Sequence, residues 1–285
     1  MNGGKGGSGM TLHLQTVPAR NGLLWMRHGF KVLRRRPMAL SGLYAMTLTV
    51  GLLLPTLLPP LGFLTLMALP LVSLGFMLAT HLVLQNITPT PAVFVAPLKL
   101  TAARRSAQLM LGAGYATLML LAVLLAQAID GGAFEQLQTL MQQDKPNPEA
   151  VAAALGDPRL FWGGSTLVTL MTLVSVLFWH APALVHWGGQ GVLQSLFSSW
   201  LGVWRNKGAF ALNGLAWLGL LLGLSMLTGL LSGLLGLPAP LMALLGLALT
   251  LVLSTAFYSS LYFSFVDCFM FGAPRELPGE AKSEA

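Results

Sequence analysis

Long stretches without charged side chains alternate with short basic clusters along this chain. Four stretches contain no Asp, Glu, Lys or Arg, and they cover residues 37–98, 106–129, 160–204 and 208–266. Each is long enough for at least one apolar helix of roughly 20 residues, the length that crosses a bilayer. They lack the alternation of apolar and polar residues that marks barrel strands. Because a helix satisfies its own backbone hydrogen bonds in lipid, the pattern predicts an all-α, polytopic membrane protein.

Prolines, glycines and charges divide these stretches into six predicted transmembrane helices. They cover about residues 39–57, 61–84, 106–129, 161–182, 209–231 and 241–266. Pro55, Pro59 and Pro60 break the chain between the first two helices, and Asp130 with the two glycines that follow it ends the third. We expect one domain over residues 10–272, preceded by a flexible Gly/Ser-rich linker at 1–9 and followed by a tail at 273–285.

Residues 131–159 form the one sizeable predicted loop. Phe134, Leu137 and Leu140 recur at helical spacing, and Asn147 with Pro148 has the residue types that begin a helix. We therefore expect two short helices outside the bilayer. They form either a lid on the ends of the spans or a face for a partner protein.

The composition supports a membrane protein and argues against nucleic-acid binding. Only 9% of the 285 residues are charged and 55% are hydrophobic, whereas a soluble domain carries roughly 25% charged residues. A net charge of +7 would suggest a nucleic-acid partner for a soluble protein. Here the basic residues lie mostly beside the predicted spans, where they set orientation and meet anionic lipid head groups.

The distribution of Lys and Arg predicts the orientation of the chain. Fourteen of the 16 fall on one side of the predicted membrane, and the other two are Lys145 and Arg159. Basic residues accumulate on the cytoplasmic side of membrane proteins. Both termini are therefore expected in the cytoplasm, with the loop at 131–159 on the opposite side.

A basic cluster precedes each pair of predicted spans. We expect these clusters to bind lipid head groups through Arg34, Arg35 and Arg36, through Lys99, Arg104 and Arg105, and through Arg205 and Lys207. Before the first and third clusters, polar and apolar residues separate onto opposite faces of a helix, as an interfacial helix requires. The order predicts three parallel repeats of interfacial helix, basic cluster and transmembrane hairpin. Anionic lipids are the preferred partners, because each basic residue near the surface contributes about 1 kcal/mol to the free energy of membrane binding.

Four ionisable residues are expected at a similar depth near the cytoplasmic ends of the spans. They are His81, His180, His186 and Asp267. One interpretation is a proton or polar site, because ionisable groups inside a membrane are costly. The other is that the histidines bond carbonyls or lipid phosphates at the interface while Asp267 pairs with a nearby arginine. His180 and His186 lie about 240° apart around an ideal helix, which disfavours a shared metal site.

No sequence motif indicates catalysis. The phosphate-binding GxxxxGK pattern, the HExxH zinc helix and the GxSxG nucleophile turn are all missing from the sequence. The single cysteine, Cys268, excludes an internal disulfide and a thiolate metal cage within one chain. We therefore expect a non-enzymatic protein without catalytic residues, metal or cofactor.

Two small-xxx-small patterns occur in and after the fifth predicted span. Gly219 pairs with Gly223, and Gly229 pairs with Gly233. Such patterns let two helix backbones approach closely. One interpretation is that these glycines pack two helices of the same chain together. The other is that they form a contact with a second copy of the chain or with another membrane protein.

The chain resembles an uncharacterised family of proteobacterial inner-membrane proteins. The resemblance rests on "TVPARNGLLWMRHGFKVLRRRPMALSG" with "PAVFVAPLKL" and on "FWHAPALVHWGGQGVLQSLFSSWLGVWRNKGAF", and it extends over nearly all of residues 10–271. More loosely, the alternation of interfacial helix and span pair is similar to the membrane domain attached to some glycerophosphodiester phosphodiesterases. The catalytic part of those enzymes has no counterpart here, so the resemblance implies an inner-membrane location and no catalytic residues.

These observations lead to one main functional hypothesis and two alternatives. The main hypothesis is a non-enzymatic inner-membrane protein in envelope organisation or lipid handling. The first alternative is a transporter or channel for a small or apolar cargo, with a pathway near His81, His180 and Asp267. The second is a membrane-embedded enzyme, for which the sequence offers no convergent acid, base or metal cluster.

Overall fold

A computed structural model describes residues 12–143, 145 and 147–271. Within these residues, six helical segments are long and apolar enough to cross a membrane, as the sequence predicts. They are α2 (Pro37–Leu57), η1 with α3 (Pro59–Leu61 and Gly62–Leu84), α5 (Ala102–Asp130), α8 with α9 (Pro158–Phe178 and Ala181–Gly188), α11 (Lys207–Leu235) and α12 (Ala239–Cys268). The predicted fold class, an all-α polytopic membrane protein, is confirmed.

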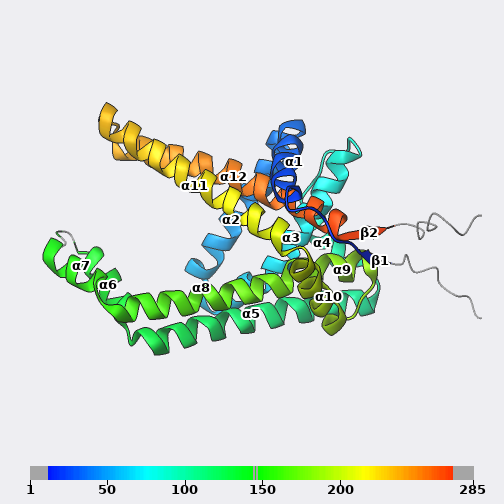
Figure 1. Cartoon of the computed structure of the whole chain (residues 1–285), viewed down its shortest axis with the longest axis horizontal. Coiled ribbons are helices and arrows are strands. Elements are labelled where there is room, and N and C mark those ends of the chain that lie inside the picture. The colour runs from blue at the N-terminus through cyan, green and yellow to red at the C-terminus, as the bar shows by residue number, and fades with distance from the viewer. Residues whose placement is uncertain (1–11, 144, 146, 272–285) are drawn as a thin grey trace, which may run out of the picture.

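The six spans form three hairpins that start and finish at one end of the molecule. Figure 1 shows α2 with α3, α5 with α8, and α11 with α12 extending away from a common region in which the shorter helices gather. The shorter helices are α1 (Asn21–Arg35), α4 (Ala92–Val95), η2 (Ala96–Lys99), α9 and α10 (Val192–Arg205). We call this region the basic end, because the three predicted basic clusters lie in or beside these helices.

A two-stranded sheet joins the two ends of the described chain at the basic end. Strand β1 (Leu12–Leu14) pairs antiparallel with β2 (Phe269–Phe271), and His13 lies opposite Met270. The pairing places the segment before the first span beside the segment after the last one, which agrees with an even number of spans because both segments then lie on the same side of the membrane. Each strand has only three residues, which is too short for an alternation of apolar and polar positions to predict it from the sequence.

Helix α1 is packed into the protein by its apolar face. Trp25 is almost completely buried, and α1 lies against α11 and α12. Gly22 and Gly29 face these two helices so closely that a Cβ atom at either position would collide with a backbone carbonyl, of Ala209 and of Ala256 respectively. The basic residues of α1 are left on its outer face, so this helix has the predicted amphipathic orientation.

Helix α10 has the opposite orientation. Its polar stripe faces the protein, where Ser195 and Ser199 are completely buried. Its apolar face points outward, with Leu193 82% exposed and Phe197 60% exposed. An exposed apolar face on a helix beside membrane spans is stabilised by lipid rather than by water.

The order of elements follows the predicted unit, but the three units differ in detail. The interfacial helix is 15 residues long in the first unit and 14 in the third, whereas the middle unit has only the four residues of α4 followed by η2. The prolines at 89, 91 and 97 account for this shortening, because proline interrupts a helix. The threefold repeat stays a prediction.

Two short helices form the loop at the end of α5, as predicted. They are α6 (Ala133–Met141) and α7 (Pro148–Leu155), and the side chain of Asn147 caps α7 by accepting a bond of 3.0 Å from the Glu149 amide. Asp157 caps α8, and its hydrogen bonds from Arg159 lower the pKa of this carboxyl group. Both short helices lie at the end of the hairpin remote from the basic end (Figure 1).

The glycines of the small-xxx-small patterns do not bring helices together within the described chain. A Cβ atom at Gly219, Gly223, Gly229 or Gly233 would meet no other atom within 4 Å. The interpretation that they pack inside the six-helix bundle is therefore wrong. Their use between copies of the chain stays a prediction.

Candidate functional site

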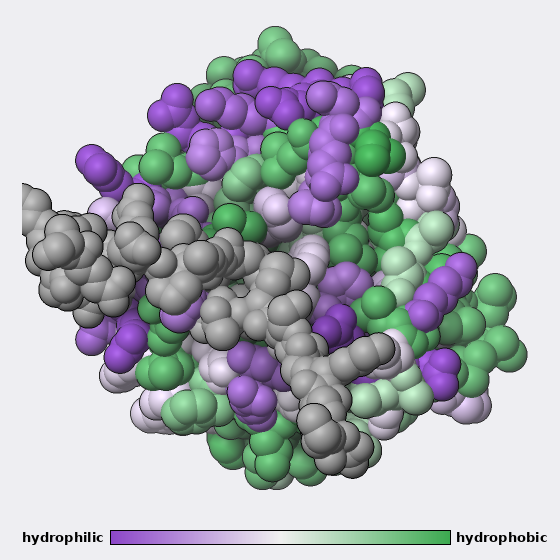
Figure 2. Space-filling view, turned by 90° about the vertical axis from the view of Figure 1, so that its right-hand side faces the viewer, coloured by the Kyte–Doolittle hydropathy of each residue, from purple (hydrophilic) through white to green (hydrophobic). Residues whose placement is uncertain are grey.

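The predicted head-group residues lie at the basic end and face outward. Seven of the eight are exposed, and Arg104 is half-buried. Among the described residues, the one ion pair joins Arg159 and Asp157 at 2.7 Å, remote from this end. Figure 2 views the molecule from the basic end and shows hydrophilic surface interleaved with hydrophobic surface. Such a surface suits the head-group layer of a bilayer, where charged and apolar groups meet.

Three of these cations have contacts that fix their positions. Arg36 Nη2 donates to the carbonyl of Asn86 at 3.4 Å, and Arg104 Nη1 donates to the carbonyl of His186 at 3.1 Å. Lys207 Nζ lies 5.1 Å from the centre of the Trp204 ring, within the range of a cation–π interaction. None of these contacts neutralises the positive charge.

A slot of about 260 Å³ opens beside the first basic cluster, and we call it the α1 slot. It is lined by His28, Lys31, Val32, Arg35, Leu84 and Phe263. His28, Lys31 and Arg35 follow one another at i, i+3 and i+7, so they share a face of α1. Burial lowers the pKa of His28, the charges of Lys31 and Arg27 lower it further, and Asp267 opposes them. Sequence analysis counted Arg35 among the head-group residues, whereas it recognised His28 and Lys31 only as part of the polar face of the interfacial helix.

The structure places the three predicted histidines around a group of aromatic rings. His180 is completely buried, and its Nε2 lies 3.1 Å from Ser264 Oγ. His81 Nδ1 lies 2.9 Å from the hydroxyl of Tyr262. The rings of His81 and His186 both contact Trp187, which stacks on Phe265, and Phe265 in turn contacts His180.

Among the residues that the structure describes, Asp267 bonds neutral donors rather than an arginine. Its Oδ2 accepts hydrogen bonds from Asn21 Nδ2 at 2.9 Å and from Trp25 Nε1 at 2.7 Å. The expected pairing of Asp267 with an arginine is therefore wrong, because the start of α1 reaches this carboxylate first. In the described part of the chain, no three His, Cys, Asp or Glu residues come together in a group able to hold a metal ion.

Asn206 is a structural residue that sequence analysis missed. Its side chain is 2% exposed and accepts a hydrogen bond from the Val17 amide at 2.8 Å. Its Nδ2 donates to the carbonyls of Gln15 and Gly202, both at 2.9 Å, and lies 3.4 Å from Cys268 Sγ. One side chain thus joins the N-terminal segment, the junction of α10 with α11, and the end of α12. Nothing local in "RNKG" distinguishes such a residue from a surface asparagine.

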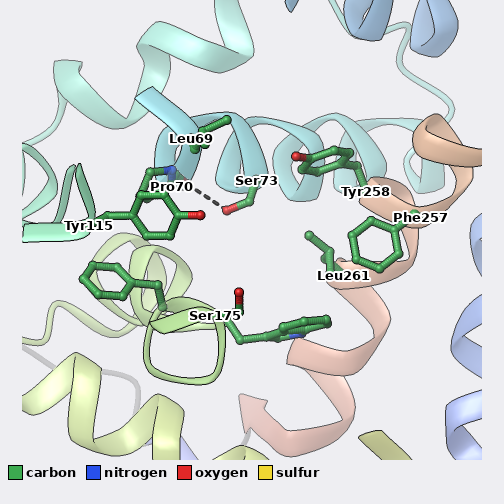
Figure 3. A pocket seen from close by; sticks show the side chains of 10 residues that line it. Leu69, Pro70, Ser73, Tyr115, Ser175, Phe257, Tyr258 and Leu261 are labelled. Atoms are coloured by element: carbon green, nitrogen blue, oxygen red, sulfur yellow. Dashed lines mark hydrogen bonds between the residues drawn. The ribbon is translucent and has the colours of Figure 1, made fainter. Parts of the chain in front are cut away.

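A cavity of about 180 Å³ lies where all three hairpins meet, between α3, α5, α8 and α12 (Figure 3). Its walls are mainly apolar and aromatic, but they carry the hydroxyl groups of Ser73, Tyr115, Ser175 and Tyr258. We call it the hydroxyl cavity. Sequence analysis missed it because the four residues come from four helices and form no motif.

Comparison with known proteins finds a relative named as an inner-membrane protein. The chain is 28% identical over 260 residues to a probable inner membrane protein of Burkholderia thailandensis, covering 90% of this chain and 94% of that protein. No family model matches the chain, and no solved structure does. The looser resemblance to the membrane domain of glycerophosphodiester phosphodiesterases thus finds no support. The relative and the six candidate spans together support a multi-pass location in the inner membrane.

Proposed function

We propose that this protein handles or organises lipids in the inner membrane by binding anionic head groups at its basic end, without catalysing a reaction. The observation that carries the proposal is the α1 slot. There the ammonium of Lys31 and the guanidinium of Arg35 stand beside a wall formed by Val32, Leu84 and Phe263. This combination matches an anionic phospholipid, whose phosphate needs cations and whose chains need an apolar surface.

The rest of the basic end supports the same activity. The predicted head-group residues of all three clusters lie at this one end, and no described acidic side chain forms an ion pair with them. Each cationic side chain near an anionic membrane surface contributes about 1 kcal/mol to the free energy of binding to that surface. The exposed apolar face of α10, with Phe197 and Trp204, adds a hydrophobic contact to the same leaflet. Under the positive-inside rule, this leaflet is the cytoplasmic one.

Charge reversal in the α1 slot provides the test. The double substitution Lys31→Glu and Arg35→Glu is expected to weaken binding of phosphatidylglycerol or cardiolipin at least about tenfold, because two attractions of about 1 kcal/mol each are replaced by repulsion. Native mass spectrometry of the purified protein with added lipid measures the affinity.

Lys145→Glu is the matched control, because this lysine is exposed in the loop remote from the basic end. It should leave anionic-lipid binding unchanged. An equal loss of binding in the control and in the double variant would contradict the proposal, as would unchanged binding in the double variant.

A further inference from the structure

The hydroxyl cavity contains polar groups that the protein itself does not satisfy. Among the described residues, the hydroxyls of Tyr115, Ser175 and Tyr258 form no hydrogen bond, whereas Ser73 Oγ donates to the Pro70 carbonyl at 2.8 Å. Figure 3 shows the hydroxyl of Tyr115 directed towards Ser73 and that of Ser175 directed into the space between the helices. These three residues are partly buried, so their hydroxyl groups reach the cavity and are free to bond a polar ligand that enters it.

The hydroxyl cavity lies deep in the spans rather than at the head-group layer. Ser73 is 11 residues from the end of α3 at Leu84, and Tyr258 is ten residues from the end of α12 at Cys268. At 1.5 Å per residue, both are about 15 Å from the basic end. No charged residue of the described chain lines this cavity.

A second cavity, which we call the α2–α3 cavity, adjoins the first. It has a volume of about 430 Å³ and lies between the two helices of the first hairpin. Its lining on α2 extends from Tyr44 to Leu54, about 15 Å along the helix. Leu69 and Tyr258 line both cavities, so the two share a wall. The volume is in the range of small-ligand sites, roughly 300–1,000 Å³.

The α2–α3 cavity is apolar and uncharged. Its lining is mostly Leu, Val, Met and aromatic residues, and Thr65 Oγ1 is buried there without a partner. A phosphate would be unfavourable in either cavity, because no cation lines them to compensate for its desolvation. The chemistry of the two cavities therefore disfavours a phosphate group inside them and sets this site apart from the α1 slot.

We infer that the two cavities together bind one neutral lipid, with its small hydroxyl- or carbonyl-bearing head in the hydroxyl cavity and one apolar chain in the α2–α3 cavity. Tyr115, Ser175 and Tyr258 bond the head, and the aromatic walls contact it. The chain lies along α2 and α3, roughly parallel to the lipid chains of the surrounding bilayer. Diacylglycerols and prenylquinones share this chemistry. The site is separate from the α1 slot, so it extends the proposed function rather than depending on it.

The first test removes hydroxyl groups only. The triple variant Tyr115→Phe, Ser175→Ala and Tyr258→Phe is expected to bind the neutral lipid at least about tenfold more weakly than the unchanged protein, since each change removes one hydrogen bond and keeps the fold's packing. The probes are dioleoylglycerol and a quinone with a ten-carbon tail, each added to the protein in phosphatidylcholine nanodiscs. Native mass spectrometry measures the binding of each probe and shows which of the two lipids the protein prefers.

The second test fills the chain-binding region. Gly51 lines the α2–α3 cavity, and a Cβ there would meet only Thr65 Cγ2, at 3.8 Å. Gly51→Leu therefore places a side chain in the cavity from a position with room for its Cβ atom, and it favours the helix. It should lower the affinity for the neutral lipid at least about tenfold.

Tyr262→Phe is the matched control, because it makes the same chemical change on α12 at a hydroxyl that bonds His81 and lines neither cavity. It should bind the neutral lipid normally, as should the Lys31→Glu and Arg35→Glu variant. Absence of neutral-lipid binding by the unchanged protein would overturn the inference. Binding that survives both the triple variant and Gly51→Leu would overturn it as well.

Discussion

Replacing Gly29 by leucine is expected to detach α1 from the spans and to lower the free energy of unfolding by about 3 kcal/mol. A Cβ atom at this position would overlap the carbonyl oxygen of Ala256 and lie 3.0 Å from Cβ of Ser260. Both neighbours belong to the rigid helix α12, so the strain is relieved only if α1 moves away. Movement of α1 would also expose Trp25 and break its bond to Asp267.

Thermal or SDS-induced unfolding in detergent, followed by tryptophan fluorescence, measures this loss. Gly223→Leu is the control, because a Cβ atom there would meet nothing within 4 Å. This change should leave the unfolding midpoint unaltered or raise it slightly, as glycine disfavours helix interiors. Equal midpoints for the Gly29 and Gly223 variants would show that α1 is not held in the observed close contact.

The second large effect is expected from Asn206→Ala. The substitution leaves the Val17 amide and the Gln15 carbonyl without their partner and removes the link between three segments of the chain. A buried group that loses its partner costs about 1–3 kcal/mol, and two are affected here, so we expect destabilisation of about 3 kcal/mol. The loss should be concentrated at the basic end, where these segments meet.

The thiol of Cys268 provides a local measurement of that change. It is completely buried beside Asn206 in the intact protein. In the Asn206→Ala variant, a maleimide should modify Cys268 much faster than in the unchanged protein under conditions in which the spans stay folded. Gln194→Ala, an exposed change on α10, should leave the thiol protected. A thiol that stays equally protected in both variants would contradict the role given to Asn206.

The spans could be predicted from sequence because lipid imposes a simple requirement. A helix of this length with no charged side chains has few alternatives to crossing the membrane. The start of α7 could also be predicted, for a different reason. The side chain of Asn147 caps the helix by a local hydrogen bond, and Pro148 fixes a backbone angle suited to its first turn. These signals depend on neighbours in the sequence, so they can be recognised without knowing the fold.

The contacts between distant segments could not be predicted in this way. Asp267 meets Asn21 and Trp25, which are more than 240 positions away in the chain. Their meeting depends on how α1 docks against α12, and that docking depends on glycines whose role is invisible in one sequence. The hydroxyl cavity is a further case, because its four hydroxyl groups come together only through the packing of three hairpins.

The amphipathic pattern of α10 was recognised in the sequence, but the pattern alone leaves its orientation open. In a soluble protein, the serine stripe would face water and Phe197 would face the core. Here Ser199 is buried and bonds the His180 amide at 2.9 Å, whereas Phe197 is exposed. Lipid reverses the usual preference, because an apolar side chain loses nothing by facing it.

The central claim is that three hairpins share one basic end and that this end faces the cytoplasm. Single cysteines test it most directly when introduced at Gln142, beyond α6, and at Gln194, on α10, in a Cys268→Ala protein, because both positions are exposed. A membrane-impermeant maleimide is applied from the periplasmic side of intact inner membranes. The account predicts that the cysteine at position 142 is labelled at once and that the one at position 194 is labelled only after the membrane is broken. The reverse pattern, or immediate labelling at both positions, would contradict it.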